Sequence, residues 1–123
     1  MNGTNYSFDT NALIHFFKGN PNLKQFTTAP IYLSIITVIE FLSFPDIKEA
    51  DKNLLFDFIN EVKVVSLSLD DIVLLNTITQ IRSLYKLKLP DAIIAATALS
   101  HRATLITNDK HFSKIPSLNI ITY

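Results

Sequence analysis

Short apolar segments typical of buried strands alternate with segments of helical spacing along almost the whole chain. Strands are predicted at residues 6–8, 31–36, 62–67, 104–107 and 118–122, where β-branched and aromatic residues cluster. Helices are predicted at residues 12–17, 38–42, 46–59, 72–85 and 91–99. This alternation, with short connections, predicts an α/β fold: a three-layer α/β/α sandwich whose central, mostly parallel sheet has about five strands.

The length of the chain and its apolar content suit one domain. A chain of 123 residues, 48% of them apolar, can bury such a core without covalent help, and no repeat or linker divides residues 1–123. Because the chain has no Cys, disulfides and thiolate metal sites are excluded, and a reducing, cytoplasmic setting is favoured. No basic residue precedes the first apolar stretch and the apolar runs are short, so we expect neither a signal peptide nor a membrane span.

Charge is unevenly distributed along the sequence although the formal net charge is zero. Residues 1–80 contain five Lys or Arg and nine Asp or Glu, whereas residues 81–123 contain six and two. Overall charge therefore does not indicate nucleic-acid binding. Two interpretations of the basic C-terminal segment stay open: chance segregation on exposed helix faces, or a functional basic rim.

Four acidic residues fall where the predicted topology brings strand ends together. Asp9 ends the first strand and Asp109 follows the fourth. Glu40 lies in the first turn of the helix after the second strand, and Asp91 starts the helix that leads into the fourth. Since ligands of open parallel sheets bind outside the carboxyl ends of the strands, these acids are expected to meet at one edge. Oxygen donors of this kind favour Mg²⁺ or Mn²⁺ over zinc.

Structural explanations also exist for the individual acids. Glu40 completes a predicted capping box begun by Thr37, and Asp91 is of a type favoured at helix starts. Asp109 suits an Asx turn. Asp9 is the hardest to explain in this way, because a carboxylate at the end of a buried strand needs a partner or a cation. Their joint placement on one edge is what favours a functional site.

The remaining polar residues do not indicate another familiar site. Three further acids are predicted to be helix caps: Asp46, Asp70 and Asp71. Three histidines lack the spacing of a zinc pair: His15, His101 and His111. The sequence has no Gly-rich phosphate loop, no G-x-S-x-G elbow and no Cys nucleophile. Of the histidines, His111 is a plausible neighbour of the acidic site.

Four segments that contain the acids resemble a known family. They are Phe8-Asp9-Thr10-Asn11-Ala12-Leu13-Ile14, Thr37-Val38-Ile39-Glu40-Phe41-Leu42, Leu89-Pro90-Asp91-Ala92-Ile93-Ile94-Ala95-Ala96-Thr97-Ala98 and Leu105-Ile106-Thr107-Asn108-Asp109-Lys110-His111-Phe112. In this order and spacing they resemble the PIN-domain nucleases, especially the VapC-type ribonuclease toxins. The resemblance covers almost the entire chain.

The resemblance implies a metal-dependent endoribonuclease that is the toxin of a toxin–antitoxin pair. It implies that one or two Mg²⁺ ions, replaceable by Mn²⁺, are held by Asp9, Glu40, Asp91 and Asp109. It implies supporting roles for Thr10, Asn11, Thr107 and Asn108, and an RNA substrate, a homodimer and a small antitoxin as partners. Four basic residues are candidates to hold flanking RNA phosphates: Lys86, Lys88, Arg102 and Lys110. Many relatives have a further acid at the position of His111, so we do not expect a five-acid site.

Two alternatives to the ribonuclease stay open. In a phosphatase with an aspartate nucleophile, Asp9 would attack phosphorus itself, but such enzymes usually have a second acid two residues later, where this chain has Asn11. The other alternative is an inactive PIN-like module that binds RNA or protein. Because all four acids are present, loss of activity is the less favoured interpretation.

Overall fold

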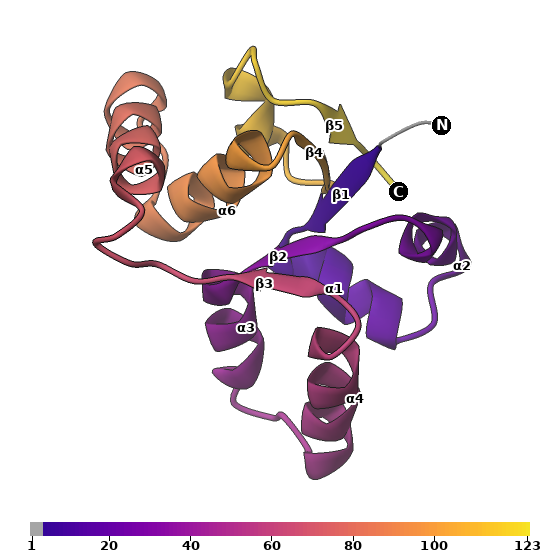
Figure 1. The fold of residues 1–123 in the computed structure, drawn as a ribbon. Helices are drawn as coiled ribbons and strands as arrows, with labels where there is room; N and C mark the ends of the chain where they lie inside the picture. Colours follow the sequence, from indigo (N-terminus) through magenta and orange to yellow (C-terminus); the bar gives the residue numbers. More distant parts are fainter. Residues whose placement is uncertain (1–3) are drawn as a thin grey trace.

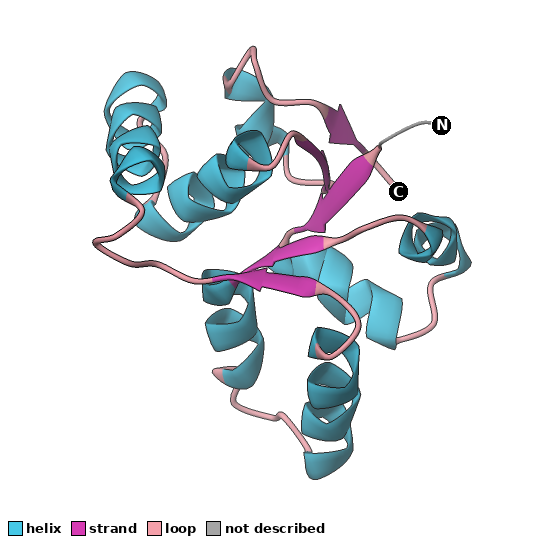
Figure 2. Cartoon of the chain, in the orientation of Figure 1, coloured by secondary structure: helices cyan, strands magenta, loops and turns pink. Residues whose placement is uncertain are grey.

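The computed structural model describes residues 4–123 and has the predicted alternation of strands and helices (Figures 1 and 2). The elements run in the order β1 (Asn5–Phe8), α1 (Thr10–Phe17), α2 (Pro21–Lys24), the 3₁₀ helix η1 (Gln25–Thr28), β2 (Tyr32–Ser34), α3 (Ile35–Leu42), α4 (Glu49–Ile59), β3 (Lys63–Val65), α5 (Ile72–Tyr85), α6 (Leu89–Ser100), β4 (Ala103–Ile106), the 3₁₀ helix η2 (Lys110–Lys114) and β5 (Ile120–Ile121). Residues 1–3 of the predicted domain lie outside the described residues.

Every strand pair among the described residues is parallel. β4 lies between β1 and β5, and β2 pairs with β3. A single parallel bridge between Tyr6 of β1 and Ile31 joins the two sheets, and the Tyr6 N–H donates to the carbonyl of Pro30 at 2.9 Å. The strand order is therefore β3-β2-β1-β4-β5, and the prediction of a parallel sheet of about five strands is confirmed.

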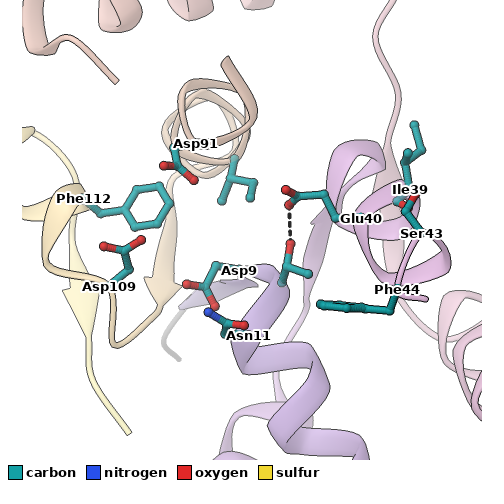
Figure 3. Close-up of a pocket in the computed structure, with 11 residues that line it drawn as sticks. Asp9, Asn11, Ile39, Glu40, Ser43, Phe44, Asp91, Asp109 and Phe112 are labelled. Carbon is teal, nitrogen blue, oxygen red and sulfur yellow. Dashed lines mark hydrogen bonds between the residues drawn. The ribbon is translucent and has the colours of Figure 1, made fainter. Parts of the chain in front are cut away.

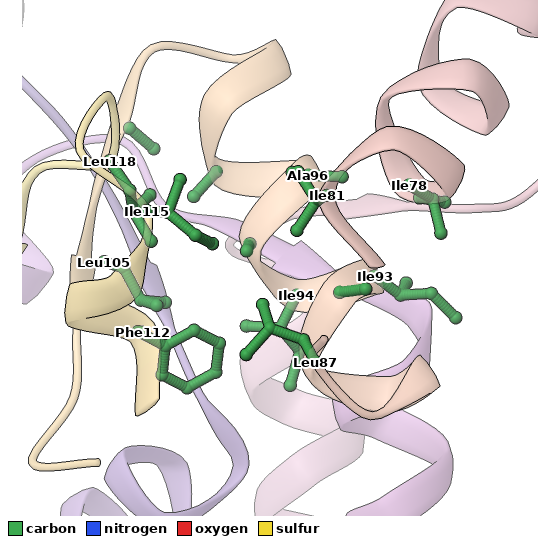
Figure 4. Close-up of a cluster of buried hydrophobic side chains, with 14 of the residues drawn as sticks. Ile78, Ile81, Leu87, Ile93, Ile94, Ala96, Leu105, Phe112, Ile115 and Leu118 are labelled. Atoms are coloured by element: carbon green, nitrogen blue, oxygen red, sulfur yellow. The ribbon is translucent and has the colours of Figure 1, made fainter. Parts of the chain in front are cut away.

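Two apolar cores lie on opposite faces of this sheet, because successive side chains of a strand point to opposite faces. Leu105 of β4 packs in the core that contains α5, α6 and η2 (Figure 4). The next residue, Ile106, packs with Phe8 in the core that contains α1, α3 and α4. Figure 1 shows these two groups of helices on either side of the strands. The predicted three-layer sandwich is confirmed.

The helix α6 is buried along most of its length. Its residues from Ala92 to Ala98 are all buried, and four of these seven are alanines. Small side chains let α5 and β4 approach α6 closely. The first turn of α6, which contains Asp91, is thereby held close to the strand ends. Within residues 4–123, no helix combines the length and the apolar character needed to cross a lipid bilayer.

The helix α3 begins earlier than predicted. Ser34 is its N-cap and accepts a hydrogen bond from the Ile36 N–H at 3.2 Å. The predicted capping box of Thr37 and Glu40 is wrong, because Thr37 is inside the helix with its buried hydroxyl unpaired among the described residues. Glu40 is the sixth residue of α3. The β-branched Ile35 and its neighbours favoured a strand, but β propensity yields readily to tertiary packing.

Two of the three predicted acidic caps are also wrong. The helix α4 begins at Glu49 with Lys48 as its N-cap, two residues later than a cap at Asp46 would require. The N–H of Asp70 donates to the Ser68 hydroxyl at 3.1 Å, and Asp70 caps no helix. Asp71 does cap α5, since its carboxylate accepts from the Leu74 N–H at 3.1 Å. The short helices α2, η1 and η2 were not predicted.

Candidate functional site

A cleft of about 390 Å³ lies at the carboxyl edge of the sheet and contains all four predicted acids (Figure 3). Asp9 directly follows β1, Asp109 follows β4, Glu40 comes from α3 and Asp91 from the first turn of α6. The structure therefore brings together four side chains from four different parts of the sequence. The rest of the lining consists of Thr10, Asn11, Ile39, Ser43, Phe44, Ile94 and Phe112.

Asp9 is the most buried of the four acids, with 5% of its surface exposed. One carboxylate oxygen accepts from the Ala12 N–H at 2.8 Å, so Asp9 itself is the N-cap of α1. Thr10 is the first residue of this helix. Burial raises the pKa of Asp9, and the nearby carboxylates add to the rise, although hydrogen bonds from Thr107 and Ala12 oppose it.

Thr107 joins two of the acids. It is fully buried, its hydroxyl donates to the second carboxylate oxygen of Asp9, and the same hydroxyl accepts from the Asp109 N–H at 2.9 Å. Asn108 does not bond to the acids. Its side-chain amide pairs with the backbone of Tyr123, donating to the carbonyl at 3.0 Å and accepting from the N–H at 2.9 Å. The predicted support of the acids by Asn108 is therefore replaced by anchoring of the loop after β4.

Glu40 and Asp91 are the two acids that are not bonded to Thr107. The Thr10 hydroxyl donates to a Glu40 carboxylate oxygen at 2.5 Å, which links α1 to α3 (Figure 3). Asp91 has no hydrogen-bond partner for its carboxylate among residues 4–123. Burial raises the pKa of Asp91, and the charges of Asp109 and Glu40 raise it further.

Asp109 forms the Asx turn that its sequence context predicted. One carboxylate oxygen accepts from the His111 N–H at 2.9 Å and lies 2.8 Å from His111 Nδ1. Burial acts to raise the pKa of Asp109, but the hydrogen bonds and charge of His111 outweigh it and the pKa is lowered. His111 is thus a direct neighbour of the acidic site.

A second cavity, which we call the lysine hollow, adjoins the acidic cleft. Its volume is about 270 Å³, and it is lined by Lys86, Leu87, Lys88, Asp91, Asp109, His111 and Lys114. The predicted phosphate-binding residues are thus separated: Lys86 and Lys88 line the hollow, whereas Lys110 lines neither cavity. Arg102 precedes β4 and lies at the opposite edge from Asp109, which corrects its predicted place beside the site.

The place of Lys114 beside the site was not predicted from the sequence, because the 3₁₀ helix η2 was not predicted. Residues three apart lie on the same side of a 3₁₀ helix, which puts Lys114 beside His111. A helical interpretation of residues 110–114 would have found it.

The donor set fits a hard divalent cation. All four acids supply oxygen ligands, and within residues 4–123 no Lys or Arg forms an ion pair with them. In the described part of the chain, no three acidic or histidine side chains stand close enough to hold a metal ion between them as they are. Mg²⁺ usually binds one or two carboxylates and keeps several waters, which suits this wider spacing.

These features define a parallel three-layer α/β protein with an acidic, oxygen-donor cleft at the carboxyl edge of its sheet. Among protein families, the model of the PIN domain matches residues 6–118 of this chain. The chain belongs to the PIN-domain family.

Several solved structures that share the fold of this chain are described as toxin–antitoxin proteins. A chain of a toxin–antitoxin complex from Klebsiella pneumoniae is 34% identical, with 95% of this chain and 96% of that chain covered and a TM-score of 0.76. A chain of VapBC2 from Rickettsia felis, in a structure with a DNA fragment from the VapBC2 promoter, is 22% identical. The match covers 98% of this chain and 99% of that chain, with a TM-score of 0.79. The VapBC-5 structure from Mycobacterium tuberculosis is 17% identical, with 98% and 99% covered and a TM-score of 0.67. A comparison with curated proteins gave no match. The predicted resemblance to VapC-type PIN proteins is confirmed.

Proposed function

We propose that this PIN-domain protein is a Mg²⁺-dependent endoribonuclease that hydrolyses RNA phosphodiester bonds as the toxin of a toxin–antitoxin pair. The convergence of Asp9, Glu40, Asp91 and Asp109 in one cleft is the observation that supports this most. The likeness to a chain from a toxin–antitoxin complex, at 34% identity over 95% of this chain, supports the toxin role.

The four acids are the residues that would hold one or two Mg²⁺ ions, with Mn²⁺ as a substitute. A divalent cation here supplies positive charge for the phosphoryl oxygens and lowers the pKa of the attacking water. Thr107 fixes the positions of Asp9 and Asp109, and Thr10 fixes Glu40. A carboxylate oxygen has two lone pairs, so Asp9 keeps acceptor capacity for a cation beside its two hydrogen bonds.

The bonds of Asp9 also count against the phosphatase alternative. Both of its oxygens accept hydrogen bonds from the protein, and its surface is 5% exposed. A nucleophile must approach phosphorus directly, in line with the leaving oxygen, whereas Asp9 is held as a fixed charge. Asn11, which stands where such enzymes usually have a second acid, is exposed at the cleft.

A groove beside the acidic cleft suits the proposed antitoxin. It has a volume of about 440 Å³, shares Asn11 and Phe44 with the cleft, and has apolar walls that include Ile14, Phe17 and Phe41. An amphipathic helix binds a groove of this kind through its apolar face. An antitoxin bound there would lie at the mouth of the acidic cleft.

The start of α5 suits the proposed homodimer. Leu69 lies in the turn just before α5, and Ile72 and Val73 are its first two residues; 84%, 55% and 70% of their surfaces are exposed. Clustered apolar side chains of this kind are typical of association surfaces. We expect a dimer in sedimentation velocity at micromolar concentration. A monomer under these conditions would contradict an obligate dimer.

RNA cleavage assays with Mg²⁺, with Mn²⁺ and with chelator test the proposed activity. We expect internal cleavage of RNA with either cation and none with chelator. Cleavage that survives chelation would exclude metal dependence. RNA binding without cleavage would indicate the inactive module, and phosphate release from a phosphomonoester would indicate the phosphatase.

A further inference from the structure

The lysine hollow adjoins the acidic cleft directly. Asp91 and Asp109 line both cavities, so the two acids form a common wall between them. The other residues of the hollow are mainly basic, whereas the other residues of the cleft include the apolar Ile39 and Phe44. The acidic site therefore has two unlike sides, and only one of them has cationic side chains.

The loop between α5 and α6 positions two of the lysines. Leu87 is buried and anchors the loop, with Lys86 and Lys88 exposed on either side of it. Lys88 is the N-cap residue of α6 but makes no side-chain capping bond. In the described part of the chain, the ammonium groups of Lys86, Lys88 and Lys114 form no ion pairs. Their charges are thus not neutralised by close contacts within the protein.

The lysine hollow is formed by residues of the basic C-terminal segment. The segment 81–123 contains six Lys or Arg and two acids, and the two acids are Asp91 and Asp109. Lys88 lies close enough to both acids for its charge to act on each: it opposes the rise in the pKa of Asp91 and contributes to the lowered pKa of Asp109. An anion that the acidic cleft would repel therefore meets an attractive charge immediately beside it.

We propose that the lysine hollow binds a backbone phosphate of single-stranded RNA, next to the phosphate that is cleaved, through Lys88 and Lys114 with Lys86 at the rim. This inference rests on the proposed ribonuclease function and deepens it. Because the hollow and the cleft share a wall, neighbouring phosphates of one strand would occupy them together. The lysines would then fix the direction in which the strand crosses the acids. Phe44, with 43% of its surface exposed, offers a surface for an unstacked base on the opposite side.

The test is the salt dependence of RNA binding, measured by fluorescence anisotropy with a short labelled oligouridylate in chelator, where no cleavage is expected. Lys88→Gln and Lys114→Gln each remove one charge without changing a buried side chain. Each phosphate contact with a single strand contributes about 0.7 to the slope of log affinity against log salt. We expect each variant to reduce the slope by about that amount. Lys24→Gln is the matched control, since Lys24 is exposed on α2 and does not line the hollow or the acidic cleft.

The outcomes separate the phosphate site from the nuclease function. An unchanged slope in both Lys88→Gln and Lys114→Gln, an equal reduction in Lys24→Gln, or no RNA binding by the wild type would each overturn the proposal. If the wild type cleaves RNA with Mg²⁺ but the slopes are unchanged, the phosphate site fails and the nuclease function stands. If the slopes fall as expected but Mg²⁺ produces no cleavage, the phosphate site stands and the nuclease function fails.

Discussion

The hydroxyl of Thr107 joins the carboxylate of Asp9 to the backbone N–H of Asp109. Asp9 and Thr107 are 98 residues apart in sequence and follow β1 and β4, which are neighbours in the sheet. A single buried oxygen thus sets the relative positions of two of the four acids. Its removal should affect the site more than the fold.

We expect Thr107→Val to lower the free energy of unfolding by about 1–3 kcal/mol, because it leaves the partly buried Asp109 N–H unpaired and removes a donor to Asp9. Cation affinity should fall by about 10–100-fold, as for other groups that orient ligands. Thr97→Val is the matched control, since Thr97 is also fully buried but donates to the Ile93 carbonyl of its own helix. Thr107→Ser should restore affinity. Equal losses of cation affinity in both valine variants would contradict the role of Thr107.

We expect RNA cleavage to fall by more than about a hundredfold when any one of the four acids is replaced by its amide. The loss should exceed that caused by changing a group that only orients a ligand, which is about 10–100-fold. Asp109→Asn and Glu40→Gln keep the side-chain volume, so circular dichroism should show an intact fold. Asp70→Asn serves as the control, because Asp70 lies outside the cleft. Wild-type turnover by Asp9→Asn in Mg²⁺ would show that the proposed site is wrong.

Mg²⁺ should stabilise the folded protein, because it offsets the repulsion among the acids. Binding to the folded chain alone gives about 1.4 kcal/mol at ten times Kd, which is a rise of several degrees in Tm. Asp91→Asn and Asp9→Asn should raise the Tm in chelator, by removing a repelled charge, and should reduce the further rise with Mg²⁺. Asp91 is the cleaner test, because its carboxylate has no hydrogen bond to lose in the described structure. Calorimetry that finds the same Tm with Mg²⁺ and with chelator would contradict a shared cation site.

The pH dependence of stability should follow the carboxylates whose pKa is raised. In the unfolded chain an Asp carboxyl has its ordinary pKa of 3.8. Because the pKa values of Asp9 and Asp91 are raised above this in the folded protein, the folded state binds their protons more tightly. Their stabilising contribution is therefore complete below pH 3.8 and is lost as the pH rises through the folded-state values. Asp109, with its lowered pKa, contributes in the opposite sense: its stabilisation is present above 3.8 and is lost as the pH falls through its folded-state value.

Melts in chelator at a series of pH values above 3.8 test this expectation. The difference in Tm between Asp91→Asn and the wild type should grow as the pH rises toward neutrality, because only the wild type then ionises Asp91. Saturating Mg²⁺ should reduce that difference, since a cation favours the ionised carboxylate. A difference in Tm that is constant with pH would mean that the pKa of Asp91 is not raised in the folded state.

The sequence alone determined the layers, the parallel sheet and the acids of the site. Apolar periodicity is a local property, and it located β1, α1 and α5 closely. Given parallel strands, the rule that ligands bind at their carboxyl ends was enough to bring Asp9 and Asp109 together. The family resemblance came from four short segments that remain recognisable without any three-dimensional information. The single-domain boundaries of 1–123 stay a prediction, since the family match covers residues 6–118.

Only the tertiary structure decided how the acids are held and what surrounds them. The start of α3 at Ile35 depended on its packing against other elements, which overrode the local preference of β-branched residues for a strand. The bonds of Thr10 to Glu40 and of Thr107 to Asp9 join residues 30 and 98 positions apart. The grouping of Lys88 with Lys114 likewise required the placement of α6 against η2. Contacts over such separations are set by the packing of whole elements, and local sequence preferences do not encode that packing.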